Sequence, residues 1–317
     1  MSDLNDHQLG PGQALVAPQA AAVEPADQLL AGRPTAFNGI AGRVLALGRQ
    51  VHHLRRGQDI WGYGARVPLQ PRCLMAASFL APRPLVLNEL QAAALAAPAL
   101  AAMECFQRVS HRKSVLITGA ADPTGALLLQ MYRGSQLLVT SGSPRSHQRL
   151  LELGLSEDQI LDYRGQRLDE LEEAVRQRTA GLGVEVAFDL VGHRLRQLCC
   201  RSVRVGGAIV SLQQEPNDQP DWRDTPLGSR SISVHSVYLP AHALSCDPRL
   251  WTHYSLQLQE VGRLFERQLL VAPRIADLGT LPQDNWSCCH DLWEQRDRLG
   301  PLAARLEPWV EPELGIF

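Results

Sequence analysis

Apolar and polar residues follow a regular strand and helix pattern through the middle of the chain. Between residues 113 and 240, apolar runs of strand length are followed by stretches with apolar residues at helical spacing. Strands are predicted at Val115 to Thr118, Gln136 to Thr140, Gln159 to Tyr163, Val184 to Val191, Ala208 to Leu212 and Ser231 to Tyr238, and helices at Ala126 to Tyr132, Ser146 to Leu153, Leu168 to Thr179 and Arg194 to Val203. Such alternation predicts a parallel, doubly wound sheet covered by helices.

The residues on either side of this region have a different pattern. Before residue 88, short apolar runs lie between glycine and proline turns, with strands predicted at Gln13 to Ala22 and at Gly39 to Val51. Asn88 is the expected N-cap of an alanine-rich helix that runs from Ala92 to Phe106 and is interrupted at Pro98. Two further helices are predicted after Pro240. They cover Arg249 to Arg267, with Leu250, Tyr254, Leu258, Val261 and Leu264 on one face, and Trp286 to Leu299. The sequence therefore predicts an α/β protein in which residues 1–105 and 245–317 form a β-rich domain and residues 106–244 form the parallel-sheet domain.

The first predicted strand of the parallel sheet leads into a turn of small residues. The turn reads Gly119-Ala120-Ala121-Asp122-Pro123-Thr124-Gly125 and is followed by a predicted helix. A strand, a small-residue turn and a helix are typical of dinucleotide binding, with the pyrophosphate at the helix N-terminus. Asp122 opposes this, because a carboxylate a few ångströms from the pyrophosphate costs about 1 to 4 kcal/mol. Pro123 also lacks an amide donor.

Composition excludes several classes of protein. The chain has 317 residues, a net charge of -2 and no basic surplus, which argues against nucleic-acid binding. It has neither a membrane-length apolar run nor a cationic leader, so we expect a cytoplasmic protein that does not bind membranes. The seven cysteines include two adjacent pairs and no zinc-knuckle spacing. We interpret them as reduced, packed thiols and predict no metal.

The order of several motifs resembles that of a known superfamily. The motifs are Gly10-Pro11-Gly12, Ala22 to Asp27, Gly42 to Gly48, Leu54 to Asp59, Glu89 to Leu95, the turn at 115–125, Ile160 to Tyr163 and Gly181 to Gly192. In this order they resemble the medium-chain dehydrogenase/reductase superfamily, in its zinc-free branch of quinone oxidoreductases and polyketide enoyl reductases. The resemblance implies a GroES-like substrate domain and a Rossmann-like domain. It also implies reduction of a quinone or an α,β-unsaturated carbonyl by NADPH.

The resemblance also implies which residues lie near the cofactor. They are Gly119, Ala120, Ala121, Thr124 and Gly125 in the turn, Ser141, Gly142 and Arg145 after the second strand, Tyr163, Val191 and Gly192. The second strand does not end in the carboxylate that holds the 2′-hydroxyl of NAD, which favours NADP. Arg145 and Arg149 are candidates for the 2′-phosphate, and the alternative is that both are solvated surface arginines.

Other positions depart from the pattern of this superfamily. Phe37-Asn38-Gly39 stands where the zinc branch has Gly-His-Glu, and Pro301 replaces a lysine. No proton donor is identified, so the catalytic residues stay unknown. We therefore carry two hypotheses. The first is an NADPH-dependent oxidoreductase acting on a small molecule or acyl thioester, and the second is a catalytically degenerate member that acts as a dimeric scaffold or partner-binding protein. In either case we expect a homodimer that pairs through Ser231 to Tyr238.

Overall fold

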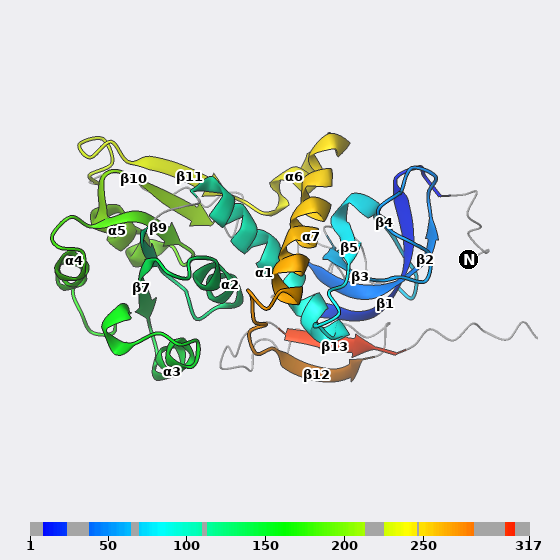
Figure 1. Ribbon diagram of the computed structural model, residues 1–317, viewed down its shortest axis with the longest axis horizontal. Coiled ribbons are helices and arrows are strands. Elements are labelled where there is room, and N and C mark those ends of the chain that lie inside the picture. The colour runs from blue at the N-terminus through cyan, green and yellow to red at the C-terminus, as the bar shows by residue number, and fades with distance from the viewer. Residues whose placement is uncertain are drawn as a thin grey trace, which may run out of the picture. The chain divides into compact units, whose positions relative to one another are not determined.

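The computed structural model describes residues 9–23, 38–64, 70–109, 113–212, 225–245, 247–281 and 302–307 (Figure 1). The chain divides into two compact units. The first unit comprises Met1–Ala97, His242–Gln268 and Arg274–Phe317, and the second comprises Pro98–Ala241 and Leu269–Pro273. The domain boundaries drawn from the sequence, after residues 105 and 244, stay predictions. The predicted helix at Trp286 to Leu299, the segment Glu24 to Asp27 and Pro301 lie outside the described residues.

The first unit contains a seven-stranded sheet that is antiparallel except at one pair of strands. Its strands are β1 (Gln13–Val23), β2 (Gly39–Leu47), β3 (Asp59–Tyr63), β4 (Cys73–Ala76), β5 (Leu80–Pro82), β12 (Ala276–Leu281) and β13 (Leu302–Leu306). They lie in the order β12-β13-β1-β2-β3-β5, and β4 pairs with β1. Strand β13 runs antiparallel to β1, with Ala20 opposite Arg305, whereas β12 and β13 are parallel. Residues from both ends of the sequence therefore share one sheet.

Helix α1 (Glu89–Arg108) begins as the sequence predicts and continues further than expected. Asn88 Oδ1 accepts a hydrogen bond from the Gln91 amide at 2.8 Å, which confirms the N-cap. The predicted interruption at Pro98 is wrong, because the helix runs through this residue. A proline inside a helix costs about 3 kcal/mol, but residues 92–97 and 99–105 are all buried, so packing stabilises the continuous helix.

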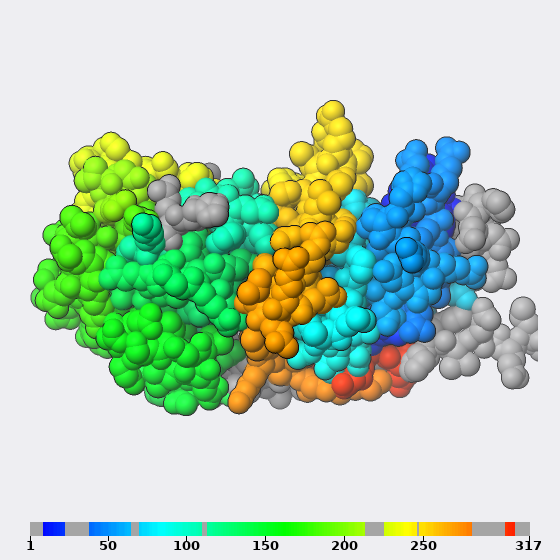
Figure 2. Space-filling view, in the orientation of Figure 1, coloured from blue at the N-terminus to red at the C-terminus, as the bar shows by residue number. Residues whose placement is uncertain are grey.

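The helical segment after residue 247 is divided, in contrast to the single predicted helix. A short 3₁₀ turn covers Pro248–Leu250, and α7 covers Thr252–Glu266. Tyr254, Leu258 and Val261 are buried as predicted, but Leu250 is 42% exposed and Phe265 takes the place expected for Leu264. The opposite side of α7 is solvated, and Figure 2 shows this helix in orange at the molecular surface.

The second unit contains a six-stranded parallel sheet. Its strands are β6 (Ser114–Ile117), β7 (Gln136–Ser141), β8 (Ile160–Asp162), β9 (Val184–Asp189), β10 (Val203–Leu212) and β11 (Ser233–Val237). Its main helices are α2 (Pro123–Met131), α3 (Pro144–Glu152), α4 (Leu168–Arg178) and α5 (His193–Ser202). Strand β10 begins five residues earlier than predicted, because Gly206 and Gly207 lie within it at a register irregularity.

The strand order of the parallel sheet is β11-β10-β9-β6-β7-β8. The chain therefore moves outward in one direction from β6 and then, after β8, in the other direction from β9. Right-handed crossovers in the two directions place helices on opposite faces. The predicted fold class, a β-rich domain with a doubly wound parallel sheet, is confirmed. The order reverses between β6 and β9, and ligands of such sheets bind outside the carboxyl ends of the strands at this switch point.

Within the described residues, no helix has the length and apolarity needed to cross a membrane.

Candidate functional site

The turn between β6 and α2 lies at the switch point and is joined there to the end of β9. Thr118 is fully buried, and its hydroxyl donates to the carbonyl of Phe188 at 3.1 Å. The same oxygen accepts the amide of Leu190 at 3.1 Å. A hydroxyl that both donates and accepts a hydrogen bond gives a partner to two buried backbone groups and is itself hydrogen-bonded. The two loops that leave β6 and β9 are therefore held together by Thr118.

The two glycines of this turn are required by close packing. Gly119 has a φ of +70°, which disfavours other residues. A Cβ on Gly125 would lie 2.3 Å from the carbonyl oxygen of Gly119, so helix α2 contacts the turn through backbone atoms. Ala120 and Ala121 are buried at the same place. The structure therefore brings together Gly119, Ala120, Ala121 and Gly125, four of the five predicted residues of the turn, as one compact backbone surface.

The N-terminus of α2 offers two amide donors and carries one negative charge. Asp122 is the N-cap and is exposed, and Pro123 is the first helical residue. Proline is favoured at this position, so Pro123 removes one donor without straining the helix. The first amide bonded to the N-cap carbonyl is that of Ala126, at 2.8 Å. The amides of Thr124 and Gly125 therefore have no acceptor within α2 and remain available to an anion.

The backbone amides of the loop after β7 are hydrogen-bonded to a side chain of α3. The hydroxyl oxygen of Ser146 accepts the amides of Gly142 at 3.2 Å and Ser143 at 3.0 Å. The hydroxyl of Ser143 in turn accepts the amide of Ser146, which completes a capping box for α3. The Ser141 hydroxyl hydrogen-bonds to the Ser146 hydroxyl at 2.8 Å. The sequence pattern does not indicate that Ser146 accepts these two amides.

Tyr163 contacts the loop at Gly142. A Cβ on Gly142 would lie 2.1 Å from the Tyr163 hydroxyl oxygen, so the ring occupies the space that a side chain at this position would need. The amide of Tyr163 donates to the carbonyl of Ser141 at 3.0 Å, which places the ring beside the end of β7. Ser141, Gly142 and Tyr163 therefore form a second group of predicted residues. Arg145 lies in the first turn of α3 and is exposed.

The last predicted pair, Val191 and Gly192, follows β9 at the switch point. Val191 is 41% exposed, and its Cγ2 lies 3.0 Å from where a Cβ on Gly119 would be. Gly192 is buried and has a φ of +83°. These two residues therefore lie beside the turn between β6 and α2. All three groups lie at the carboxyl ends of the neighbouring strands β7, β6 and β9.

These groups fit a dinucleotide in their backbone and oppose it in one charge. Gly119 and Gly125 form a close backbone turn, and the amides of Thr124 and Gly125 are open to a pyrophosphate. The carboxylate of Asp122 is itself favoured at a helix N-terminus and repels a second anion there. The turn therefore combines a backbone that suits a phosphate group with a charge that repels one.

The described cysteines have the properties of packing residues. Cys73, Cys105, Cys199 and Cys200 are free and buried. Burial raises the pKa of the Cys105 thiol to about 12 and that of Cys200 to about 11. Burial, reinforced by the Asp189 carboxylate, also raises the pKa of Cys199. Since the thiolate is the nucleophile, these thiols are unreactive at neutral pH.

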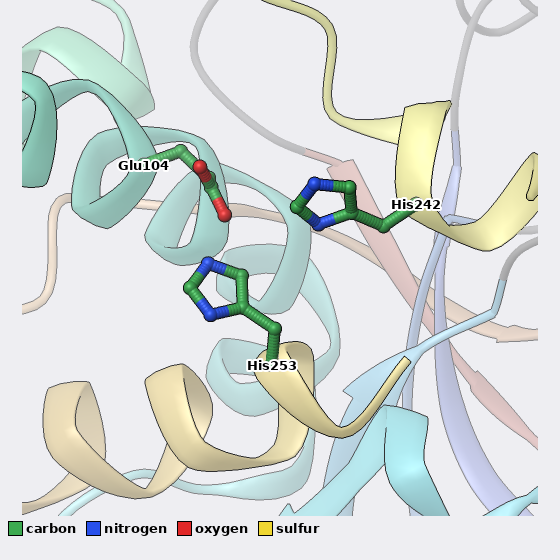
Figure 3. Close-up of side chains that lie close together, drawn as sticks. All are labelled: Glu104, His242 and His253. Carbon is green, nitrogen blue, oxygen red and sulfur yellow. The ribbon is translucent and has the colours of Figure 1, made fainter. Parts of the chain in front are cut away.

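One histidine pair in the first unit was not predicted. Figure 3 shows His242 on α6 (Pro240–Leu244) and His253 on α7, and their ring centroids are 5.4 Å apart. His253 Nε2 hydrogen-bonds to the side-chain amide of Gln257 at 2.8 Å. Glu104 belongs to the second unit, where Arg108 pairs with it at 3.3 Å. The two histidines lie on different helices without a spacing motif, so no sequence pattern indicates the pair.

Comparisons with curated proteins identify distant relatives. No family model matches the chain. A phthioceranic/hydroxyphthioceranic acid synthase of Mycobacterium bovis is 29% identical over 248 residues, which cover 73% of this chain and 11% of that protein. A quinone oxidoreductase-like protein 2 homolog of Nematostella vectensis is 23% identical and covers 67% of this chain and 58% of its own length. The chain thus spans about a tenth of the synthase and somewhat more than half of the second relative.

Solved structures match almost the whole chain. An alcohol dehydrogenase superfamily protein from Novosphingobium aromaticivorans has a TM-score of 0.80 and 23% identity, over 96% of this chain and 95% of that one. The Escherichia coli quinone oxidoreductase complexed with NADPH has a TM-score of 0.74 and 20% identity, over 94% and 92%. The CurK enoyl reductase has a TM-score of 0.75 and 20% identity over the same shares. The chain therefore has the fold of the medium-chain dehydrogenase/reductase superfamily, a GroES-like domain with a Rossmann-like domain, as its motifs predicted.

Proposed function

We propose that this protein is an NADPH-dependent oxidoreductase that reduces a quinone or an α,β-unsaturated carbonyl by hydride transfer. The observation that carries the proposal is the turn at the switch point. Two packed glycines there leave the amides of Thr124 and Gly125 at the N-terminus of α2 without an acceptor in that helix. A phosphate group is the ligand that such a terminus binds best.

Each predicted residue has a role in this proposal. The amides of Thr124 and Gly125 bind the pyrophosphate. The small residues Gly119, Ala120 and Ala121 leave space for it close to the backbone. Arg145 is exposed beside the loop that ends β7 and binds the 2′-phosphate. Ser141, Gly142 and Tyr163 border the ribose, and Val191 and Gly192 border the nicotinamide end. When bound, NADPH supplies the hydride.

The relatives suggest the class of substrate. A match within a phthioceranic/hydroxyphthioceranic acid synthase and a likeness to the CurK enoyl reductase favour an acyl thioester, whereas the quinone oxidoreductases favour a quinone. Nothing in the described residues selects one of these. Turnover of NADPH with 1,4-benzoquinone and with a crotonyl thioester separates the two options.

Asp122 and Ser146 favour a second candidate function, that of a non-catalytic scaffold. The Asp122 carboxylate places a negative charge at the N-terminus of α2, and the Ser146 hydroxyl accepts the amides of Gly142 and Ser143. A chain that had lost its cofactor would retain the fold and a pairing surface. Val205 and Val234, on β10 and the edge strand β11, are 71% and 39% exposed, and a homodimer would cover them. Light scattering tests this dimer.

Titration of the wild-type chain with NADPH separates the two functions. Saturable binding with reduction of a quinone or an enoyl thioester supports the oxidoreductase. Lack of binding at about 1 mM NADPH, an affinity weaker than about -4 kcal/mol, contradicts it. The scaffold gains support if Asp122→Gly with Pro123→Gly binds NADPH and the wild-type chain does not.

A further inference from the structure

A buried ion pair stands behind the end of β9, beside the candidate cofactor site. Asp189 is fully buried, and only 9% of the Arg196 side chain is exposed. Arg196 Nε donates to Asp189 Oδ2 at 2.6 Å, and the hydroxyl of Ser211 donates to the same oxygen at 3.0 Å. The other carboxylate oxygen accepts the amide of Gly192 at 2.7 Å. Both oxygens of the carboxylate are therefore hydrogen-bonded within the second unit.

Stability alone does not account for this pair. Removing two charges from water costs several kcal/mol per ion, and a buried pair is often no more stable than apolar residues of the same size. The partners do fix the geometry of the turn. The carbonyl of Gly192, which has a φ of +83°, accepts the amides of Leu195 and Arg196 at 3.1 and 3.2 Å. The ion pair, the glycine and the first turn of α5 thus hold one another in place.

This rigid turn lies beside the turn between β6 and α2. Thr118 bonds to the backbone on both sides of Asp189, at Phe188 and Leu190. The side chain of Val191 lies beside Gly119, where its Cγ2 would be 3.0 Å from an added Cβ, and Val191 remains 41% exposed. The turn therefore presents a fixed apolar surface at the switch point between β6 and β9. A ligand that enters this point meets Val191 in a position set by Asp189 and Arg196.

We propose that Asp189 and Arg196 are positioning residues that hold Val191 and Gly192 against the nicotinamide end of the bound cofactor. The proposal rests on the proposed function. The ion pair contacts the cofactor only through this turn. Its loss displaces the surface that borders the nicotinamide and leaves the amides of Thr124 and Gly125, and Arg145, unchanged. A misplacement of about 1 Å can cost about a hundredfold in the rate of a reaction between positioned groups, so the nicotinamide end depends on where this surface lies.

The test uses two ligands that differ in the nicotinamide half. NADPH has both halves, whereas adenosine 2′,5′-bisphosphate reaches only the adenosine end. The variant is Asp189→Asn with Arg196→Met, which removes both charges so that neither is left unpaired. We expect its Kd for NADPH to rise about tenfold and its Kd for the bisphosphate to change by less than about twofold. A purely structural role would weaken both ligands alike.

A second ion pair of the same sheet supplies the control. Glu185 and Arg204 form an ion pair at 2.9 Å near the opposite ends of β9 and β10. Glu185→Gln with Arg204→Met should leave both affinities unchanged. If the Asp189 and Arg196 variant does not fold, Ser211→Ala removes only one donor to the carboxylate. A rise of about threefold in the Kd for NADPH alone is then expected, at the low end of the effect of such supporting contacts.

The outcomes distinguish this proposal from the function on which it rests. A wild-type chain that binds neither ligand overturns the oxidoreductase and the positioning role together. Binding of both ligands by the wild-type chain, with equal loss or no loss for the two ligands in the variants, overturns the positioning role alone. Selective loss of NADPH supports both.

Discussion

The turn after β6 and the loop after β7 lie at the same edge of the parallel sheet and differ in whether their backbone amides have an acceptor within the protein. The first leaves the amides of Thr124 and Gly125 open and places the carboxylate of Asp122 beside them. The second is uncharged, but the Ser146 hydroxyl already accepts its amides. The affinity of an anion site can thus be lowered by a nearby negative charge, or by a side chain that already accepts the amide hydrogen bonds. Only repulsion is screened by salt.

The largest expected effect tests the rigidity of the two regions. A Cβ at position 125 meets a backbone carbonyl at 2.3 Å, whereas a Cβ at position 142 meets the far end of the Tyr163 ring at 2.1 Å. We expect Gly125→Ala to lower the free energy of unfolding by about 2 kcal/mol or more, because backbone cannot yield. Gly142→Ala should cost clearly less, because a tyrosine ring can rotate away. Urea unfolding of both variants measures the difference, and equal losses would contradict it.

Removing the charge at the first turn should give the next largest effect. Asn is as favourable as Asp at an N-cap and the Asp122 side chain makes no capping hydrogen bond, so Asp122→Asn removes the negative charge without the loss of a cap. Its Kd for NADPH should fall about tenfold at low salt, within the about 1 to 4 kcal/mol expected for two charges at this range. Calorimetry at two salt concentrations should show the gain shrink as salt rises. Asp247→Asn, at the N-cap of a short helix in the first unit, is the control and should leave the Kd for NADPH unchanged.

Releasing the amides of the second loop should have a smaller effect. Ser146→Ala removes the acceptor of Gly142 and Ser143 and frees both donors for the 2′-phosphate. We expect the preference for NADPH over NADH to rise about threefold, less than the about 1 kcal/mol of one hydrogen bond because α3 loses part of its cap. Ser143→Ala damages the same cap but leaves Ser146 on the amides, so it should lower the melting temperature without a change in preference. An unchanged ratio in Ser146→Ala would mean that the loop does not meet the 2′-phosphate.

The smallest effect concerns an acid whose charge is already paired. Asp162 ends β8, and the hydrogen bond from the Arg164 guanidinium lowers its pKa from 3.8 to about 2. Because the folded-state pKa is lowered, the stabilisation is present above pH 3.8 and is lost as pH falls toward 2. NMR titration should show the pKa return toward 3.8 in Arg164→Ala. NADPH affinity at pH 7 should not change, in contrast to Asp122→Asn.

The fold was predictable where the pattern is local and repeated. Strand and helix periods predicted the parallel sheet, and glycines 119 and 125 predicted the close turn between β6 and α2, where a side chain would meet backbone atoms at position 125. The missed features depend on contacts between distant residues. Thr118 bonds to Phe188, and Asp189 pairs with Arg196 and Ser211. Pro98 shows the same limit, because burial overrides a local preference.

Sequence also identified substitutions without their physical reason. Gly39 was interpreted as the loss of a glutamate. A Cβ at this position would lie 2.0 Å from the carbonyl oxygen of Ala93, so strand β2 contacts the backbone of α1 and leaves no space for any side chain. The glycine is therefore required by packing, whatever the activity of the protein.

The pairing of β13 with β1 has a consequence for the order in which the protein folds during synthesis. The second unit is almost continuous, and residues 114–237 supply all six of its strands. Strand β2 is made early and pairs with one side of β1, but the other side of Ala20 to Val23 has no partner until Leu302–Leu306 has been made. Until then this part of the strand exposes backbone groups to other chains on the ribosome. We therefore expect the parallel sheet to form first and the antiparallel sheet to be the part that most needs protection from aggregation.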